Sequence, residues 1–180
     1  MLKKLFVPLV IVLLFVLIPP AFYFLDYSQS ISFKKEEVTY VLPYPGILPD
    51  HPLYFVKTMR DRIIDWVTRD NIKKAEYYLL FSDKRTAMAM SLAKNGKDNL
   101  AISTFSKAEK YFYKIPGLLQ EAKKQGVSPK SELVNNLKLS NAKHYEIGQS
   151  LLKVLPQGSS EEINQVLKLN QEIKKEIDKL

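Results

Sequence analysis

Two histidines and a group of charged residues are the side chains of this sequence whose types and spacing could support acid–base chemistry. His51 lies in a proline-rich stretch, and His144 lies on the apolar stripe of an expected helix. Asp61 and Asp65 are one turn apart if their segment is helical, and two neighbouring carboxylates can serve as general acid and base. These four residues are the first candidates for an active site.

The charged residues also have a structural interpretation, which we favour. If the two helices that carry them form an antiparallel hairpin, Asp83 on the second helix lies opposite the start of the first. Lys57 or Arg60 could then pair with Asp83, and Arg85 could pair with Asp61. Such pairs fix the register of two helices more than they add stability. We therefore expect interhelical ion pairs here.

The histidines have structural interpretations as well. We expect His51 to have a capping or turn role and His144 to be a core histidine that donates to a carbonyl or hydroxyl. The alternative for His144 is a partner-binding or pH-sensitive site. The chain has no cysteine, and it lacks HExxH spacing, an Asp-rich loop, a Ser-His-Asp pattern and a nucleotide fingerprint. We predict no catalytic residue, no cofactor and no metal.

A hydrophobic segment precedes all of these candidates. Residues 5–25 carry no charge, and as a helix rising about 1.5 Å per residue they would span roughly 30 Å, the thickness of a hydrocarbon core. Lys3 and Lys4 lie before the segment and Asp26 lies after it. The positive-inside rule therefore places the amino end in the cytoplasm and the rest of the chain outside.

Two prolines leave a second interpretation of this segment open. Pro19 and Pro20 interrupt backbone hydrogen bonding, so the uninterrupted helix would resemble the apolar region of a secretory signal peptide. Residues 28–30 offer small side chains for cleavage. We expect a retained single-pass transmembrane anchor, with a cleaved signal and secretion as the alternative. Both interpretations export the domain.

A proline-rich linker follows, over residues 26–52. Its prolines favour a semi-rigid extended chain. Pro49 and Pro52 lie at its end, and Pro52 suits a first helical turn, where its missing N–H has no partner to lose. Asp50 is placed to cap that helix. We interpret this stretch as the lead-in to the first helix of the domain.

The rest of the chain has helical spacing of apolar residues and no strand alternation. The pattern predicts helices over residues 53–68, 71–94, 98–115, 118–124, 128–154 and 161–179, the third and fourth being separated by a kink at Pro116. Asp70 is expected to cap the second helix, and Gly96 to end it. Short turns make neighbouring helices antiparallel. The fold class is thus all-α, an antiparallel bundle of four to five helices preceded by a single transmembrane helix and the linker.

The first and last of these helices carry clear apolar stripes. In the first, Val56, Met59, Ile63 and Val67 lie on one stripe beside Trp66, which we expect to face the core. In the last, coiled-coil a and d positions are occupied by Ile163, Val166, Asn170, Ile173 and Ile177. That helix is too short for a stable independent coil. We expect a terminal helix of the bundle, with weak self-association as the alternative.

Several stretches together resemble a known family. LPDHPLYFVKTMRDRI, followed by KKAEYYLLFSDKRTAMAMSLAKNG and LKLSNAKHYEIGQSLLKVLP, is similar to the bacterial domain-of-unknown-function family 5667, over residues 42–180. Its most specific part is formed here by Leu48, Pro49, Pro52, Leu53, Tyr54 and Lys57. Ser82 replaces the family's usual Ala, and a Met-rich stretch follows Arg85. The resemblance implies an exported or membrane-attached helical domain and assigns no activity.

The charge of the chain indicates the kind of partner. A net charge of +8 suits anionic lipid, cell-wall polymer or nucleic acid, and an exported location argues against nucleic acid.

We predict a membrane-anchored, extracytoplasmic, non-catalytic interaction or structural module with a protein or cell-wall partner. A secreted tetratricopeptide-like adaptor is the alternative, and an enzyme comes third. Candidate structural or interaction residues are Pro49, Pro52, Tyr54, Lys57, Asp61, Asp83, Arg85 and His144. The expected regions are 1–4 (cytoplasmic end), 5–25 (anchor), 26–52 (linker) and 53–180 (bundle).

Overall fold

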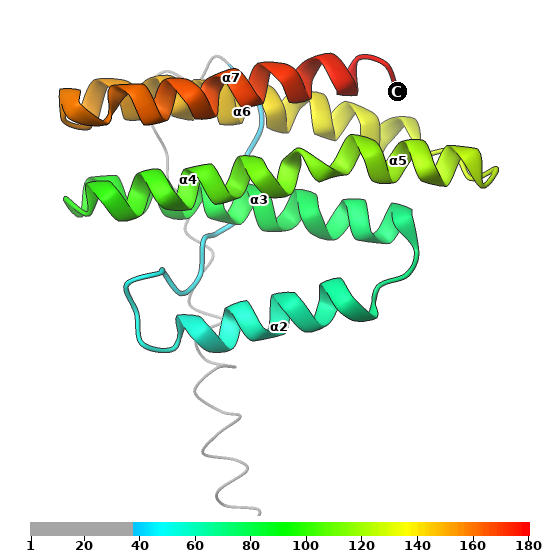
Figure 1. The fold of residues 1–180 in the computed structure, drawn as a ribbon, viewed down its shortest axis with the longest axis horizontal. Helices are drawn as coiled ribbons and strands as arrows, with labels where there is room; N and C mark the ends of the chain where they lie inside the picture. The colour runs from blue at the N-terminus through cyan, green and yellow to red at the C-terminus, as the bar shows by residue number, and fades with distance from the viewer. Residues whose placement is uncertain (1–37) are drawn as a thin grey trace, which may run out of the picture. The chain divides into compact units, whose positions relative to one another are not determined.

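The computed structural model describes residues 38–180, so the segment predicted to be an anchor or signal lies outside the described residues. Within them the chain is all helical (Figure 1). The elements are α2 (Tyr54–Val67), α3 (Asn71–Lys94), α4 (Asp98–Phe112), α5 (Lys114–Lys124), α6 (Ser131–Val154), the 3-10 turn η1 (Gln157–Ser159) and α7 (Ser160–Ile177). Over residues 38–180 no helix has the length and apolar character needed to cross a membrane.

Four helical rods form the bundle, and α2 lies on its outside. Figure 1 shows α3 running against the combined α4 and α5, with α6 and α7 forming the next layer. Each rod runs antiparallel to the one before it in the chain. α2 contacts the bundle through α3. Counting α4 and α5 as one kinked rod gives five helices, so the predicted all-helical fold is confirmed.

The ends of α3 follow the local signals in the sequence. The Asp70 carboxylate accepts hydrogen bonds from the backbone N–H groups of Ile72 and Lys73, at 2.9 and 3.1 Å, which satisfies two unpaired donors of the first turn. Gly96 follows the helix with φ of 69°. The N–H groups of Gly96 and Lys97 then close back on the last turn of α3, a Schellman arrangement. Both predictions for this helix are confirmed.

The kink between α4 and α5 lies at Tyr113, three residues before the proline that was expected to cause it. Pro116 is in the first turn of α5, where it has no N–H to donate and its ring crowds the preceding carbonyl groups. The backbone of Tyr113 stays in the helical region, and its N–H still bonds to the Glu109 carbonyl at 2.8 Å. The chain therefore bends here and continues, with Pro116 itself buried.

α2 is oriented opposite to our prediction. The side chains of Val56, Met59, Ile63 and Val67 are exposed by 52 to 62%, and that of Trp66 by 86%. The buried residue of α2 is Asp61, which is only 2% exposed. The prediction that the apolar stripe of this helix faces the core is therefore wrong. The periodicity identified the face correctly, and the tertiary structure places that face outward.

Residues 38–53, the described part of the lead-in before α2, belong to the folded body. Leu42 and Leu48 pack against the core formed by α3, α4, α6 and α7. His51 Nδ1 accepts a hydrogen bond from the N–H of Leu53 at 3.1 Å, so its predicted turn role is confirmed. The predicted cap by Asp50 is wrong, because α2 has no side-chain cap and Asp50 forms an ion pair with Lys97.

Candidate functional site

His144 lies at the centre of the bundle and is completely buried. It projects from α6, and each of its ring nitrogens contacts a carboxylate. Nδ1 lies 2.7 Å from Glu109 Oε1 on α4, and Nε2 lies 3.0 Å from Asp83 Oδ1 on α3. Side chains of three helices, α3, α4 and α6, therefore meet at one imidazole ring.

The two carboxylates are held by further hydrogen bonds. Asp83 accepts from the Ser140 hydroxyl at 2.5 Å and from the Tyr40 hydroxyl at 2.7 Å. Glu109 accepts from the Asn170 side-chain amide at 3.2 Å, and Asn170 also exchanges side-chain-to-backbone bonds with Asn141, both at 3.1 Å. The network thus joins the lead-in to α3, α4, α6 and α7. Asn170, the lone polar residue on the apolar stripe of α7, points into the bundle.

The network favours the charged form of His144. Burial by itself lowers the pKa of the imidazole, but the negative charge of Glu109 and the hydrogen bonds to Asp83 and Glu109 outweigh it and raise the pKa to about 9. At neutral pH both ring nitrogens therefore donate. An imidazolium has no free lone pair, so it can neither accept a proton from a substrate nor coordinate a metal. The expected core histidine is observed, with carboxylates as its acceptors.

Glu109 is the network residue that the sequence analysis missed. It is fully buried and lies four residues after Phe105 and three before Phe112, both of which are core residues of α4. A single glutamate at an apolar helical spacing is the signal that could have identified it, since a carboxylate is almost never fully buried without a partner. The histidine on α6 is that partner.

A second buried cluster attaches α2 to α3. Asp61 Oδ2 lies 3.1 Å from Arg85 Nη2, and Asp61 Oδ1 lies 2.7 Å from Arg60 Nη2. Arg85 also donates to the carbonyl of Phe81 at 3.1 Å, and its guanidinium lies 4.4 Å from the centre of the Tyr111 ring. The predicted pairing of Arg85 with Asp61 is confirmed. The predicted pairing of Lys57 or Arg60 with Asp83 is wrong, because Asp83 faces His144.

Lys57 and Tyr54 connect α2 to the lead-in and to this cluster. The Lys57 ammonium donates to the carbonyl of Pro45 at 2.6 Å, across the turn at Gly46. Burial, together with the nearby charge of Lys84, lowers the pKa of Lys57 to about 7. Burial also raises the pKa of Tyr54. Pro49 is half-buried and Pro52 is exposed. These residues shape the approach to α2.

Asp65, the other half of the proposed carboxylate pair, has its own partners. It accepts from the Tyr78 hydroxyl at 2.5 Å and lies 2.9 Å from the Lys74 ammonium. Burial acts to raise the pKa of Asp65, but the bonds from Tyr78 and Lys74 outweigh it and lower the pKa. Asp61 and Asp65 thus contact different residues of α3 instead of forming a carboxylate pair.

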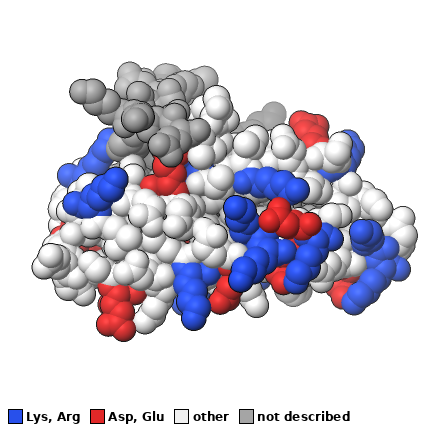
Figure 2. Space-filling model, turned by 90° about the horizontal axis from the view of Figure 1, so that it is seen from above, with Lys and Arg blue, Asp and Glu red and all other residues white. Residues whose placement is uncertain are grey.

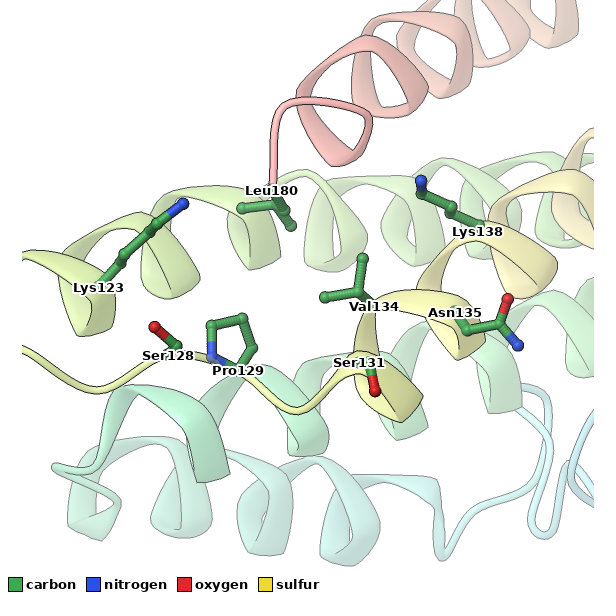
Figure 3. A pocket seen from close by; sticks show the side chains of 8 residues that line it. All are labelled: Lys123, Ser128, Pro129, Ser131, Val134, Asn135, Lys138 and Leu180. Atoms are coloured by element: carbon green, nitrogen blue, oxygen red, sulfur yellow. The ribbon is translucent and has the colours of Figure 1, made fainter.

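A pocket of about 390 Å³ lies at the end of the bundle where α5 turns into α6 (Figure 3). Its wall is formed by Lys123, Ser128, Pro129, Ser131, Val134, Asn135, Lys138 and Leu180. None of these residues belongs to the His144 network or to the Asp61 cluster. The pocket is therefore separate from the buried charged groups of the His144 network and the Asp61 cluster.

The exposed side of α2 is the other distinctive surface. We define the outer face of α2 as Phe55, Val56, Met59, Ile63, Trp66 and Val67, all of which are more than half exposed. Arg60 and Arg62 are also exposed, and at 100° per residue they lie on the two sides of this apolar stripe. An exposed apolar stripe of this kind makes the outer face of α2 a candidate interaction site.

Comparison with known proteins identifies a family. Residues 46–180 match the family described as a domain of unknown function, DUF5667. The match covers the last residues before α2, α2 itself and the whole bundle. No curated protein and no solved structure matches the chain.

Proposed function

Since this chain belongs to the DUF5667 family of domains of unknown function, we propose its function from its own geometry. The protein is a non-catalytic interaction module, anchored in the membrane by residues 5–25 and exposed on the extracytoplasmic side. Its partner is a protein or a cell-wall polymer in addition to the membrane. The observation that carries this proposal is the outer face of α2, which displays six large apolar side chains to solvent.

The chemistry of the buried groups supports a structural role for them. His144 donates through both ring nitrogens to carboxylates and is completely buried. A general base needs a free lone pair within reach of a substrate proton, and this histidine offers neither. The Asp83–His144–Glu109 network instead fixes the positions of three helices, so that α3 presents Arg85 to α2.

The composition of the amino-terminal segment supports the anchor. Residues 5–25 are uncharged and are long enough to span a hydrocarbon core, and basic residues precede them as the positive-inside rule requires.

Fractionation of cells that express the full chain tests this proposal. We expect the full-length protein in the membrane fraction after an alkaline wash, and we expect protease added outside the cytoplasmic membrane to remove the bundle. A chain of reduced length in the soluble extracytoplasmic fraction would support the cleaved-signal alternative. Full-length protein in the cytosol would contradict both the anchor and the export of the domain.

A further inference from the structure

We infer that the outer face of α2 docks on the surface of the membrane to which the chain is anchored, with anionic lipid headgroups and the upper acyl chains as its ligand. This inference rests on the proposed function: it keeps the anchor and names the membrane, in place of a protein or cell-wall polymer, as what covers the outer face of α2. It adds a specific ligand class and a specific surface, because an anchored bundle could equally stand away from the bilayer on its linker.

The side chains of the outer face suit an interfacial helix. Such a helix places an apolar stripe about 5–10 Å into the boundary between headgroups and acyl chains and keeps its charges at the rim. On α2 the stripe consists of bulky residues that include a tryptophan, and indole rings favour this interface. Trp66 is the most exposed large apolar side chain among the residues that the structure describes, at 86%.

The charges around the stripe are complementary to anionic lipid. Arg62 is exposed on one side of the stripe, and Arg60, which also pairs with the buried Asp61, is exposed on the other. Long arginine side chains can place their charge in the headgroups while their stems cover apolar surface. The acidic residues of α2 turn the other way, since Asp61 is buried against Arg85 and Asp65 pairs with Lys74. The outward charge of this helix is therefore basic.

The far side of the bundle has a different character. Figure 2 shows the side formed by α6 and α7, where lysines and arginines are interspersed with aspartates and glutamates. On α7 the exposed positions include Glu161, Glu162, Lys168, Glu172, Lys174 and Lys175. A mixed charged surface of this kind is typical of a face that stays in water. Among the helices that the structure describes, α2 is the one that combines a stripe of residues more than half exposed with a basic rim.

The length of chain before the described residues makes this contact attainable. Twelve residues, 26–37, separate the uncharged segment from residue 38, so this stretch reaches at most about 45 Å even when fully extended. The bundle is thus confined close to the bilayer. A tether converts a weak surface contact into an intramolecular one with a high effective concentration. The face of one short helix is then enough to hold the bundle on the membrane surface.

The single tryptophan of the chain provides a direct test. The full chain is reconstituted in vesicles of phosphatidylglycerol and phosphatidylcholine in equal parts, and in vesicles of phosphatidylcholine alone. Trp66 fluorescence is recorded with aqueous iodide and with doxyl-labelled lipids as quenchers. In the anionic vesicles we expect a blue-shifted spectrum, loss of iodide quenching and gain of quenching by the lipid label.

Matched variants separate docking from folding. The double variant Met59→Ser with Ile63→Ser removes two apolar side chains from the stripe. The variant Arg62→Gln removes one charge. The loss of this charge should reduce docking on anionic vesicles roughly fivefold, as expected for one basic residue near such a surface. The controls are Val154→Ser, an exposed valine at the end of α6, and Lys175→Gln on α7. All five positions are exposed, so the circular dichroism melting curves should coincide with that of the wild type.

The outcomes distinguish the two proposals. If the chain is washed from the vesicles by alkali, the anchor is wrong and the docking inference falls with it. If the chain stays on the vesicles while Trp66 remains open to iodide in the anionic lipid, the docking inference alone is overturned. Protection from iodide without quenching by the lipid label would also overturn it, because α2 would then be covered by a second copy or by another segment of the chain.

Discussion

The Arg85 guanidinium of α3 lies 3.1 Å from the Asp61 carboxylate of α2, and both groups are buried. This pair determines which side of α2 faces inward. Turning the helix over to bury its apolar stripe would place apolar side chains against Arg85 and leave that cation without its carboxylate. A buried charge without a partner is strongly destabilising, so the pair keeps the outer face of α2 in contact with solvent.

Replacement of Asp61 tests this relationship. Asp61→Asn leaves Arg85 buried without an anionic partner, and breaking a buried pair in this way costs about 3–5 kcal/mol. We expect a loss of that size in the free energy of unfolding, measured by urea titration, and faster amide exchange in α2 than in α4. The control is Glu121→Gln, which removes an exposed pair with Lys124 and should change stability by less than about 1 kcal/mol. Equal effects of the two substitutions would contradict the assigned role.

The raised pKa of His144 predicts a dependence of stability on pH. The folded value is about 9 and the ordinary value is 6.5, so the folded state holds a proton that the unfolded state releases between these pH values. The contribution is complete below about pH 6.5 and is lost as the pH rises through 9. The shift corresponds to a contribution on the order of 3 kcal/mol.

His144→Gln isolates this contribution. The variant should be much less stable than the wild type at pH 6, and the difference should narrow towards pH 9.5. Lys57, whose pKa is lowered to about 7, acts in the opposite direction in both proteins and cancels in the difference. Urea titrations at four pH values give the comparison. A difference that stays constant with pH would mean that His144 is not the titrating group.

The hydroxyl of Tyr40 anchors the lead-in. It donates to Asp83 at 2.7 Å, and Tyr40→Phe removes one bond to a carboxylate. We expect a loss of about 1.5–3 kcal/mol and faster proteolysis between residues 38 and 53, followed by mass spectrometry. Tyr113→Phe, at an exposed tyrosine, should leave both quantities unchanged. If the two variants behave alike, the lead-in is not held through this bond.

Gly148 permits the close approach of α6 to α7 and α4. A Cβ atom at this position would lie 2.4 Å from Leu167 Cδ2 and 3.1 Å from Phe105 Cε1. Gly148→Ala should therefore cost about 1–3 kcal/mol through overpacking. Gly117 in α5 has open space around it, so Gly117→Ala should stabilise by about 0.5–1 kcal/mol. Thermal melts of the two variants should shift in opposite directions, and a stabilised Gly148→Ala variant would contradict the packing.

The two prolines of the lead-in should affect its order and not the helices. Pro49→Ala and Pro52→Ala allow more backbone conformations to the unfolded chain, yet neither proline lies within a helix. We expect the double variant to keep its helical circular dichroism while the lead-in exchanges amide hydrogen faster. A wholly unfolded double variant would show that this stretch has a larger part in the fold than its contacts indicate.

The sequence by itself determined the secondary structure and most helix ends. These features depend on contacts within a few residues, and such contacts can be predicted from the local sequence. They include the helical periodicity, the Asp70 cap, the glycine after α3 and the proline in α5. The pairing of Asp61 with Arg85 was also predicted from the sequence, because a short hairpin leaves few registers for two neighbouring helices.

The tertiary structure decided the orientation of α2 and the partners of the buried charges. A periodic stripe shows which side chains share a face, and it carries no information on whether that face meets the core or the solvent. The acceptors of His144 come from α3 and α4, which are separated from it by 61 and 35 residues. Which carboxylates reach one ring depends on how all four rods pack at once, and that arrangement follows from the sum of long-range contacts.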